Sequence, residues 1–387
     1  MNRSLVLKIV KSFSARFEET PLIVQSPGRI NIIGEHTDYN DGFVLPAAIN
    51  KYIVAALSRN TSDRCSVYSI DMDDHYEFDL ENLEAIAEVS WKNYVIGVVA
   101  ELIKKGLKIE PFNLVFGGDI PNGAGLSSSA ALENSVVFGL NKLFELQLSK
   151  FDMIRISQQA EHNYVGVKCG IMDQYASMFG SQDHALLLDC RSLHAEPIKV
   201  DLGENQIILI NTNVSHTLAE AAYNDRRASC ERVAKQLGIS ALRDASENKL
   251  NSIEHQLSAS DFRKAKYVIQ ENDRVGRAAQ FLKAGLIREL GSLLFEAHAG
   301  VRDLFEVSCK ELDFLVDKAS ENPHVLGARM MGGGFGGCTI NIVQSKYLEE
   351  FKEAISSSYM KAFGKPCSIY SVALVDGVNQ IDPIVLK

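Results

Sequence analysis

The chain has 387 residues, of which 46% are hydrophobic and 23% charged, and its formal net charge is -9 at pH 7. This composition is that of an ordinary globular protein, and the length suits two domains. The acidic balance argues against nucleic acid or an anionic membrane as a partner, because both attract basic surfaces. The 7 cysteines show no C-x-x-C pair and no zinc spacing, which predicts reduced thiols. No apolar run has membrane-spanning length, so we expect no membrane span and a cytoplasmic protein.

Helices and strands alternate in the predictions for the first half of the chain. Residues 1–19 carry an apolar residue at every fourth position from Leu5, which predicts an amphipathic helix. The segments "YIVAALS" and "CSVYSI" are rich in β-branched and aromatic residues and predict strands. The segment "WKNYVIGVVAELIKKG" changes to a helical period that stops at Gly106, and "FNLVFGGD" predicts the next strand. A glycine-rich turn then opens into a helix, with Leu132 and Val136 on its apolar face.

In the second half, "ALLLD" and "QIILIN" predict short buried strands, separated by a polar stretch that contains a proline. We expect the chain to change domain there. Residues 203–305 have mainly helical patterns, and "RMMGGGFGGCTINIV" then leads a second glycine loop into a strand, before a last helix and the strand-like "IYSVALV". These patterns predict an α+β fold. The expected domains are residues 1–200 and 201–387, with the alternative that the last strand returns to the N-terminal domain.

The first glycine loop lies in "GDIPNGAGLSSSAALE". Gly123 and Gly125 permit positive φ angles, and three serines follow at the start of a helix. The N-terminus of a helix attracts phosphate through its free N–H groups and its dipole. No lysine follows the glycines, so the loop is not a Walker-type site. A simple helix cap made by the serines remains the alternative interpretation.

The second glycine loop, residues 332–337, formally matches G-x-G-x-x-G. A dinucleotide-binding fingerprint follows a strand and opens a helix, whereas this loop precedes a strand. The sequence therefore excludes that fold here. A tight structural turn and a close backbone approach to a nucleotide both remain open.

Two carboxylates are of interest in "QAEHNYVGVKCGIMDQYASMFG". Asp173 follows "GIM" in a largely apolar neighbourhood, where a carboxylate is costly unless it is paired or has a chemical task. A buried Asp that caps a helix is the alternative. Glu161 by itself is typical of a solvated helix residue.

The most unusual stretch is "SPGRINIIGEHTDYNDGFVLP". Arg29, Glu35, His36 and Asp38 lie between the apolar segments "INIIG" and "FVLP". Charged loops are usually solvated, but the flanks of this one predict burial. We expect the polar groups to converge on a small, hydroxyl-rich ligand, because carboxylates and imidazole make directed hydrogen bonds to sugar hydroxyls.

These segments resemble a known enzyme family. "GRINIIGEHTDYNDGFVLP" resembles the galactokinase signature, "PNGAGLSSSAALE" resembles the phosphate loop of the GHMP small-molecule kinases, and "GARMMGGGFGGCTI" is similar to their third motif. They occur in the family's order, with "GIMDQY" between them, and the likeness covers nearly the whole chain. The resemblance implies a two-domain α+β GHMP kinase fold with its active site in the interdomain cleft. It also implies Mg²⁺-dependent transfer of the γ-phosphoryl group of ATP to the anomeric hydroxyl of α-D-galactose, the entry to galactose catabolism.

The resemblance also implies roles for single residues. Asp173 would take the proton of the anomeric hydroxyl, with Arg29 as its partner. The sugar-binding residues would be Glu35 and His36 on the primary hydroxyl, Asp38 and Tyr223 at and beside the axial hydroxyl, and Thr37 among them. The triphosphate cradle would be Gly123, Ala124, Gly125, Leu126, Ser127, Ser128 and Ser129. Ser129 and Glu161 would serve the Mg²⁺ ion, and Trp91 and Tyr94 would line the adenine pocket.

Two alternatives stay open at this point. An N-acetylgalactosamine kinase of the same fold would differ in what surrounds the second carbon of the sugar. A galactose-sensing regulator would bind sugar and ATP without catalysis, but the intact "SSSAA" after the glycines argues against it. We expect galactose and ATP as the only partners and a monomeric protein.

Overall fold

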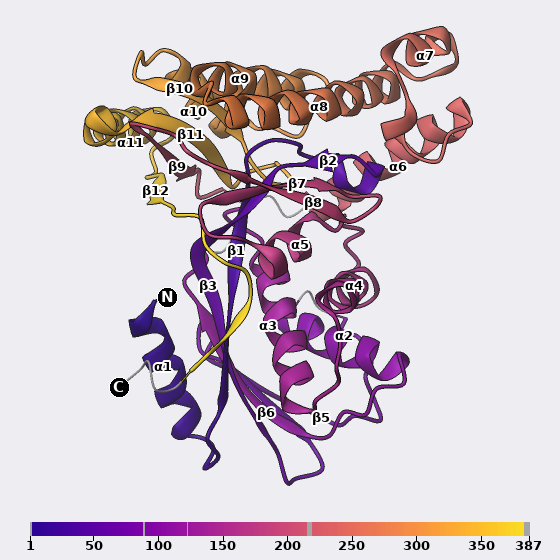
Figure 1. Cartoon of the computed structure of the whole chain (residues 1–387), viewed down its shortest axis with the longest axis vertical. Coiled ribbons are helices and arrows are strands. Elements are labelled where there is room, and N and C mark those ends of the chain that lie inside the picture. The colour runs from indigo at the N-terminus through magenta and orange to yellow at the C-terminus, as the bar shows by residue number, and fades with distance from the viewer. Residues whose placement is uncertain (1, 88–89, 122, 215–218, 383–387) are drawn as a thin grey trace.

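A six-stranded sheet forms the lower half of the molecule in the orientation of Figure 1, and helices with two smaller sheets form the upper half. The structure is a computed structural model that describes residues 2–87, 90–121, 123–214 and 219–382. Asn122 of the first glycine loop lies outside these residues. The mixture of mainly antiparallel sheets and separate blocks of helices confirms the predicted α+β class.

The large sheet has the strand order β13-β1-β3-β6-β4-β5, and all its neighbours are antiparallel except β4 and β6. Its strands are β1 (Leu22–Asn31), β3 (Pro46–Arg59), β4 (Cys65–Ser69), β5 (Asp74–Phe78), β6 (Phe112–Gly118) and β13 (Asn379–Ile381). Alternate residues of β3 face opposite sides: Val54 and Ala56 pack with helix α1, whereas Ala55 and Leu57 face the larger core. The apolar residues of this predicted strand are therefore buried on both faces of the sheet.

The other two sheets have the orders β2-β7-β8 and β10-β11-β9-β12. Their strands are β2 (Phe43–Val44), β7 (His184–Asp189), β8 (His194–Lys199), β9 (Asn205–Asn211), β10 (Val325–Met330), β11 (Cys338–Gln344) and β12 (Ser368–Ser371). The polar stretch between "ALLLD" and "QIILIN", for which no element was predicted, contains strand β8. β8 is an edge strand with one solvated face, which explains its polar sequence and its tolerance of Pro197.

Helices cover both halves of the molecule. They are α1 (Arg3–Ser14), α2 (Trp91–Lys104), α3 (Ser128–Leu143), α4 (Lys150–Ala160), α5 (Met172–Phe179), α6 (Ala219–Leu237), α7 (Glu247–Ser252), α8 (Ala259–Ala284), α9 (Ile287–Asp303), α10 (Lys310–Ser320) and α11 (Leu348–Phe363). Short helical turns are η1 (Asp38–Asn40), η2 (Glu161–Val165), η3 (Leu242–Asp244), η4 (Glu254–Gln256) and η5 (Ser345–Tyr347). Helix α1 lies on one side of the large sheet and α2 to α5 lie on the other (Figure 1). None of the helices in the described part of the chain has the length and apolarity needed to cross a membrane.

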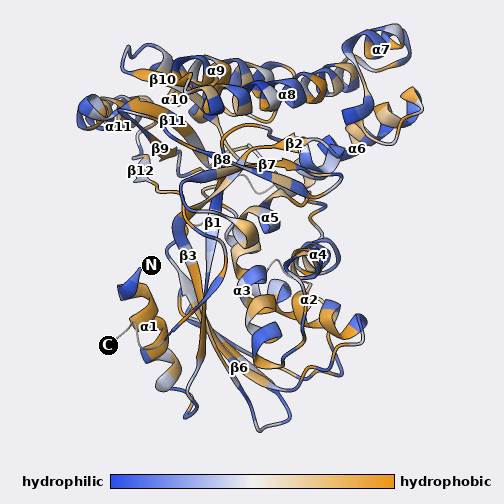
Figure 2. Ribbon diagram, viewed as in Figure 1, coloured by the Kyte–Doolittle hydropathy of each residue, from blue (hydrophilic) through white to orange (hydrophobic). Residues whose placement is uncertain are grey.

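The two halves share one large hydrophobic cluster. It includes Val24 and Leu57 of the lower sheet together with Val275, Leu293 and Ile340 of the upper half, and much of α2, α3 and β6 is coloured as hydrophobic in Figure 2. Strand β13 pairs with β1, so the described C-terminal end of the chain lies on the lower sheet. The stretch "SPGRINIIGEHTDYNDGFVLP", which begins within β1, lies where the upper and lower halves meet.

Candidate functional site

A cavity of about 120 Å³ lies where segments from both halves meet. Its lining includes residues of every motif singled out in the sequence except the first glycine loop: Arg29, Glu35, His36, Asp38, Glu161, Val167, Cys169, Met172, Asp173, Tyr223, Gly332 and Gly333. We call this space the small cavity. Residues up to 297 positions apart in sequence are in contact around it, since His36 Nε2 lies 3.3 Å from the carbonyl oxygen of Gly333.

Arg29 and Asp173 form the central ion pair of the small cavity. Arg29 Nε donates to Asp173 Oδ1 and Arg29 Nη2 to Oδ2, each over 2.8 Å, which is the strong bidentate geometry of guanidinium and carboxylate. Arg29 Nη1 also donates to the carbonyl oxygen of Gly125 over 2.5 Å. Because Asp173 lies in the first turn of α5 and is paired by Arg29, it is not the helix cap offered as an alternative. The pair links the end of β1, the start of α5 and the first glycine loop.

Glu35 is held by a second, deeper ion pair. Arg329 Nη1 and Nη2 donate to Glu35 Oε1 over 3.0 and 3.1 Å, and both side chains are 1% exposed. The backbone N–H of Gly332 donates to the same oxygen over 2.9 Å. Arg329 also donates to the carbonyl oxygens of Ile32 and Asn31. Arg329 and Gly332 of the third motif therefore fix the side chain of Glu35 in the first motif. All of these contacts are made to Glu35 Oε1.

His36 lies among aromatic rings. Its Nδ1 is 2.9 Å from the Tyr39 hydroxyl, its Nε2 is 3.3 Å from the carbonyl oxygen of Gly333, and its ring centroid is 5.2 Å from that of Tyr223. Burial is the main reason why the pKa of His36 falls to about 3, so the imidazole is neutral at neutral pH. A neutral ring can offer one nitrogen as donor and one as acceptor.

Thr37 is buried but does not line the small cavity. Its hydroxyl lies within hydrogen-bond distance of the carbonyl oxygens of Gly34 (2.9 Å) and Phe43 (2.6 Å). The threonine thus closes the loop that carries Glu35, His36 and Asp38, and its contacts give it a structural task there.

Asp38 begins η1 and lines the small cavity. Its carboxylate is packed so tightly against Gly170 that a Cβ there would lie 1.9 Å from Asp38 Oδ2. Burial, followed by repulsion from Asp173, raises the pKa of Asp38 to about 7. A buried carboxylate whose charge is poorly stabilised by the protein is suited to accept hydrogen bonds from the hydroxyl groups of a ligand.

The first glycine loop leads directly into α3. Gly123 and Gly125 have φ angles of 67° and 70°, and Leu126 accepts a backbone hydrogen bond from Arg29 over 3.1 Å. Ser127 precedes the helix in a left-handed conformation and makes no side-chain cap; its hydroxyl donates to Asp173 Oδ2 over 2.5 Å instead. The simple capping interpretation is therefore wrong for this serine. The N–H groups at the start of α3 remain available to an anion.

The second glycine loop packs on the first. A Cβ at Gly332 would lie 3.3 Å from the carbonyl oxygen of Gly125, and one at Gly337 would lie 3.3 Å from the backbone of Ala124. Both glycines have positive φ angles, 89° and 80°. The loop thus combines a tight turn with a close backbone approach, and the group that it approaches is the first glycine loop.

A larger cavity of about 300 Å³ lies on the other side of the start of α3. It is lined by Trp91 and Tyr94 of α2, by Ser128, Ser129 and Leu132 of α3, and by Ile53, Ser69, Asp71, Met72, Ser90 and Phe116. The Trp91 indole N–H donates to Asp74 Oδ2 over 3.0 Å, and Phe116 packs edge-on against its ring at 5.2 Å. Fixed aromatic rings beside an apolar space suit a flat heterocycle.

Ser129 and Glu161 lie together between the two cavities. Ser129 Oγ is 3.3 Å from Glu161 Oε1, and Gln174 Nε2 donates to Glu161 Oε2 over 2.9 Å. Glu161 is 8% exposed, so its interpretation as a solvated helix residue is wrong. Burial, with repulsion from Asp173, raises the pKa of Glu161 to about 7. Two oxygen donors, one of them a carboxylate that lacks a cation, fit Mg²⁺, which keeps several water ligands of its own. In the described part of the chain no cluster of three or more His, Cys, Asp or Glu residues could hold a metal ion.

Some residues that line the small cavity, and Arg329 behind it, were not singled out from the sequence. Cys169 and Met172 lie in the quoted "KCGIMDQY", and Arg329 lies in the quoted "GARMMGGG", but neither segment has a charge pattern or period that marks them. Their positions depend on contacts across the fold, such as the 3.6 Å contact of Cys169 Sγ with Glu161 Oε2.

Three family models match the chain: the galactokinase galactose-binding signature over residues 11–59, the GHMP kinase N-terminal domain over residues 93–181 and the GHMP kinase C-terminal domain over residues 278–362. The first covers Arg29 and Glu35, and the second covers the first glycine loop and Asp173.

Relatives match over nearly the full chain. A galactokinase of Thermotoga petrophila is 41% identical over 92% of this chain and 99% of its own length, and one of Clostridium perfringens is 41% identical over 92% and 94%. The crystal structure of Lactococcus lactis galactokinase complexed with galactose has a TM-score of 0.92 and 34% identity over 97% of this chain and 99% of its own. A mevalonate kinase structure, at TM-score 0.63 and 17% identity over 92% and 99%, shares the fold alone. This chain belongs to the galactokinase family of the GHMP kinases.

Proposed function

We propose that this protein transfers the γ-phosphoryl group of ATP, with Mg²⁺, to the anomeric hydroxyl of α-D-galactose and so forms galactose 1-phosphate for galactose catabolism. One observation carries the proposal. The Asp173 carboxylate lines the small cavity, and its partner Arg29 also bonds to the Gly125 carbonyl in the first glycine loop. An acceptor hydroxyl bound in the small cavity would therefore lie beside a phosphate held by that loop.

The lining of the small cavity supports a sugar as the acceptor. We propose that Glu35, through Oε2, and His36 bind the primary hydroxyl, and that Asp38 and Tyr223 bind the hydroxyls at and beside the axial position. The Lactococcus lactis relative was solved with galactose. Carboxylates and a neutral imidazole in a buried space bind hydroxyls well, since each offers directed acceptors.

The larger cavity and the glycine loop support ATP as the donor. We propose that Trp91 and Tyr94 line the adenine site and that residues 123–129 cradle the triphosphate through backbone N–H groups. Ser129 and Glu161 would hold Mg²⁺, which supplies positive charge to the phosphoryl oxygens during transfer. Thr37 is left out of the sugar-binding set because its hydroxyl closes the loop.

In this arrangement the protein's own residues mainly orient and stabilise. Asp173 accepts the proton of the acceptor hydroxyl, and Arg29 keeps the Asp173 carboxylate in place and adds positive charge near the transferred group. Phosphoryl transfer depends chiefly on positioning and electrostatic stabilisation. A site with one Arg, one Asp and a backbone cradle is sufficient for that chemistry.

We further propose a monomer that works in the cytoplasm, with domains of residues 1–200 and 201–387 and with the last strand, β13, returning to the first domain, which its pairing with β1 supports. The cytoplasmic proposal is supported by the cysteines, all of which are free thiols in the structure.

The test is a coupled assay of ADP release with galactose, N-acetylgalactosamine, glucose or 2-deoxygalactose at equal concentrations, each with and without Mg²⁺. The proposal expects turnover with galactose, little with glucose and none without Mg²⁺. Preference for N-acetylgalactosamine would assign the sister activity. Sugar-dependent ATP binding without turnover would assign a sensor.

A further inference from the structure

The loop that carries Glu35, His36 and Asp38 is not a relaxed chain. Gly34, His36 and Asp41 have φ angles of 104°, 61° and 57°, and its only regular element is the three-residue turn η1. A left-handed conformation costs a residue other than glycine about 1–2 kcal/mol. Contacts from outside the loop must hold it in this shape.

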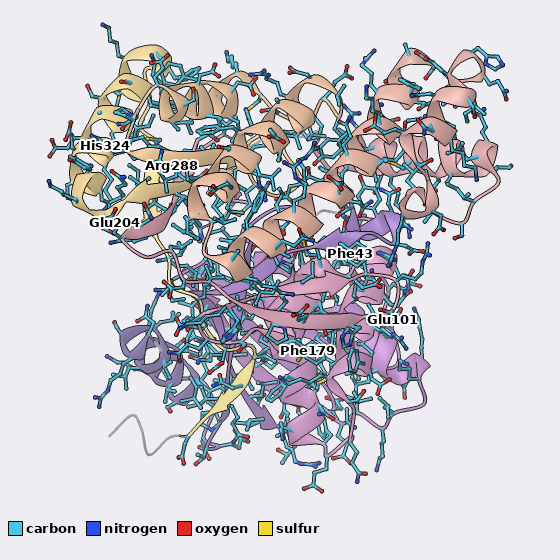
Figure 3. The ribbon with its side chains drawn as sticks, turned by 45° about the horizontal axis from the view of Figure 1, so that its top comes forward. Phe43, Glu101, Phe179, Glu204, Arg288 and His324 are labelled. Carbon is cyan, nitrogen blue, oxygen red and sulfur yellow. The ribbon has the colours of Figure 1, made fainter. Side chains whose placement is uncertain are left out.

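Helix α8 supplies such contacts. The Tyr267 hydroxyl donates to the carbonyl oxygen of Glu35 over 3.0 Å. Glu271 Oε1 accepts from the backbone N–H of Gly34 over 2.9 Å, and Asn272 Oδ1 accepts from the backbone N–H of Phe43 over 2.9 Å. Tyr267 and Glu271 are four positions apart and lie close together on the helix, and they reach the start of the loop at Gly34 and Glu35. Asn272 reaches its end at Phe43. Figure 3 labels Phe43 at this junction.

The side chains of α8 that contact the loop are themselves held in place. Glu271 is 0% exposed and accepts from Arg274 Nε over 2.7 Å through its other oxygen. The Tyr267 ring packs on Phe305 at 4.7 Å. Val275 lies so close to the loop that a Cβ at Gly34 would be 2.8 Å from its Cγ2. Movement of α8 would therefore move the backbone of the loop that carries Glu35 and His36.

We propose that Tyr267, Glu271 and Asn272 are positioning residues for the sugar: they hold the loop of residues 34–43 in its ligand-ready shape without lining the small cavity. This inference rests on the proposed function. A loop that is already ordered loses less conformational freedom when the sugar binds, so these contacts raise galactose affinity. They do not touch the first glycine loop or the larger cavity, so ATP affinity is independent of them.

The sharpest test compares Tyr267→Phe with Tyr359→Phe. Both tyrosines are 0% exposed, and each hydroxyl donates to one backbone carbonyl, that of Glu35 over 3.0 Å or of Thr212 over 2.8 Å. Each change removes one buried hydrogen bond and keeps the ring, so both variants should lose similar stability. We expect galactose Kd, measured by calorimetry without nucleotide, to rise about fivefold in Tyr267→Phe alone. The KM for galactose should rise with it, while kcat and the KM for ATP stay within about twofold of wild type.

A second variant, Asn272→Ala, removes the acceptor of the Phe43 N–H and should weaken galactose binding in the same way. Equal galactose Kd values in wild type and Tyr267→Phe, or the same rise in Tyr359→Phe, would overturn the inference. Failure of the unmodified protein to bind galactose would instead overturn the proposed function, so the two failures are distinguishable.

Discussion

The Ser127 hydroxyl donates to Asp173 Oδ2 over 2.5 Å and so ties the start of α3 to the start of α5. The same oxygen accepts from Arg29 Nη2 and the other, Oδ1, from Arg29 Nε, each over 2.8 Å. Each carboxylate oxygen can accept about two hydrogen bonds. Oδ1 therefore keeps capacity for one further donor, which is what an acceptor hydroxyl requires.

Asp173→Asn should abolish most turnover and leave sugar binding intact. The amide has the size of the carboxylate but cannot accept the hydroxyl proton, and loss of a general base costs about 10²–10⁴-fold in kcat. Single-turnover kinetics and galactose calorimetry measure the two effects separately. Full activity in this variant would remove Asp173 from the catalytic role.

Asp38→Asn should raise the KM for galactose, and its effect on stability should depend on pH. The pKa of Asp38 is raised from 3.8 to about 7, mainly by burial. Since this folded-state pKa lies above the unfolded one, ionisation of Asp38 opposes folding, and the stability that protonated Asp38 contributes is lost as pH rises from the unfolded pKa to the folded one, about 7. The stability advantage of Asp38→Asn should grow by up to about 1.4 kcal/mol per pH unit between the two pKa values and level off above the higher one.

Urea unfolding of wild type and Asp38→Asn at about pH 5, 6 and 8 measures this difference within the pH range of the linkage. A constant difference in the free energy of unfolding across that range would contradict the raised pKa.

Ser129→Ala should weaken the Mg²⁺ site. Loss of one oxygen donor is expected to raise the Mg²⁺ concentration for half-maximal activity about tenfold, and to weaken Mn²⁺ binding to the ADP complex measured by electron paramagnetic resonance. Ser135→Ala is the matched control, because the Ser135 hydroxyl lies on the same helix and donates to the Leu132 carbonyl over 2.7 Å. Equal Mn²⁺ affinity in both variants would rule out Ser129 as a metal ligand.

Arg329→Met should destabilise the fold. Glu35 and Arg329 are both 1% exposed, and removing one partner of a buried pair leaves a charge without compensation, which costs about 3–5 kcal/mol. Arg263→Met is the control, because Arg263 and Glu306 form an exposed pair (40% and 42%), and such pairs contribute about 0–1 kcal/mol. Similar urea midpoints for the two variants would show that the buried pair contributes no more than the exposed one.

Local patterns were enough to predict most elements. The apolar repeat from Leu5 predicted α1, the periodic face around Val136 predicted α3, and Gly106 marks the end of α2 with a φ angle of 78°. The sequence did not predict β8, because an edge strand that pairs with β7 alone needs few apolar residues and so lacks the pattern of a buried strand. The segment "IYSVALV" predicted a longer strand than the structure contains. Strand β12 ends at Ser371, because its pairing with β9 ends there.

The sequence by itself determined the family, the α+β class and the residue types available for sugar and phosphate, because these depend on short motifs with fixed internal spacing. Only the tertiary structure decided which groups meet. Arg329 reaches Glu35 across 294 residues, and Tyr267 reaches the same residue across 232. Thr37 turned inward to close its loop, and Ser127 turned to Asp173 instead of capping α3. Such contacts depend on how separate elements pack, since long-range burial selects the partner of each polar group and no local pattern encodes it.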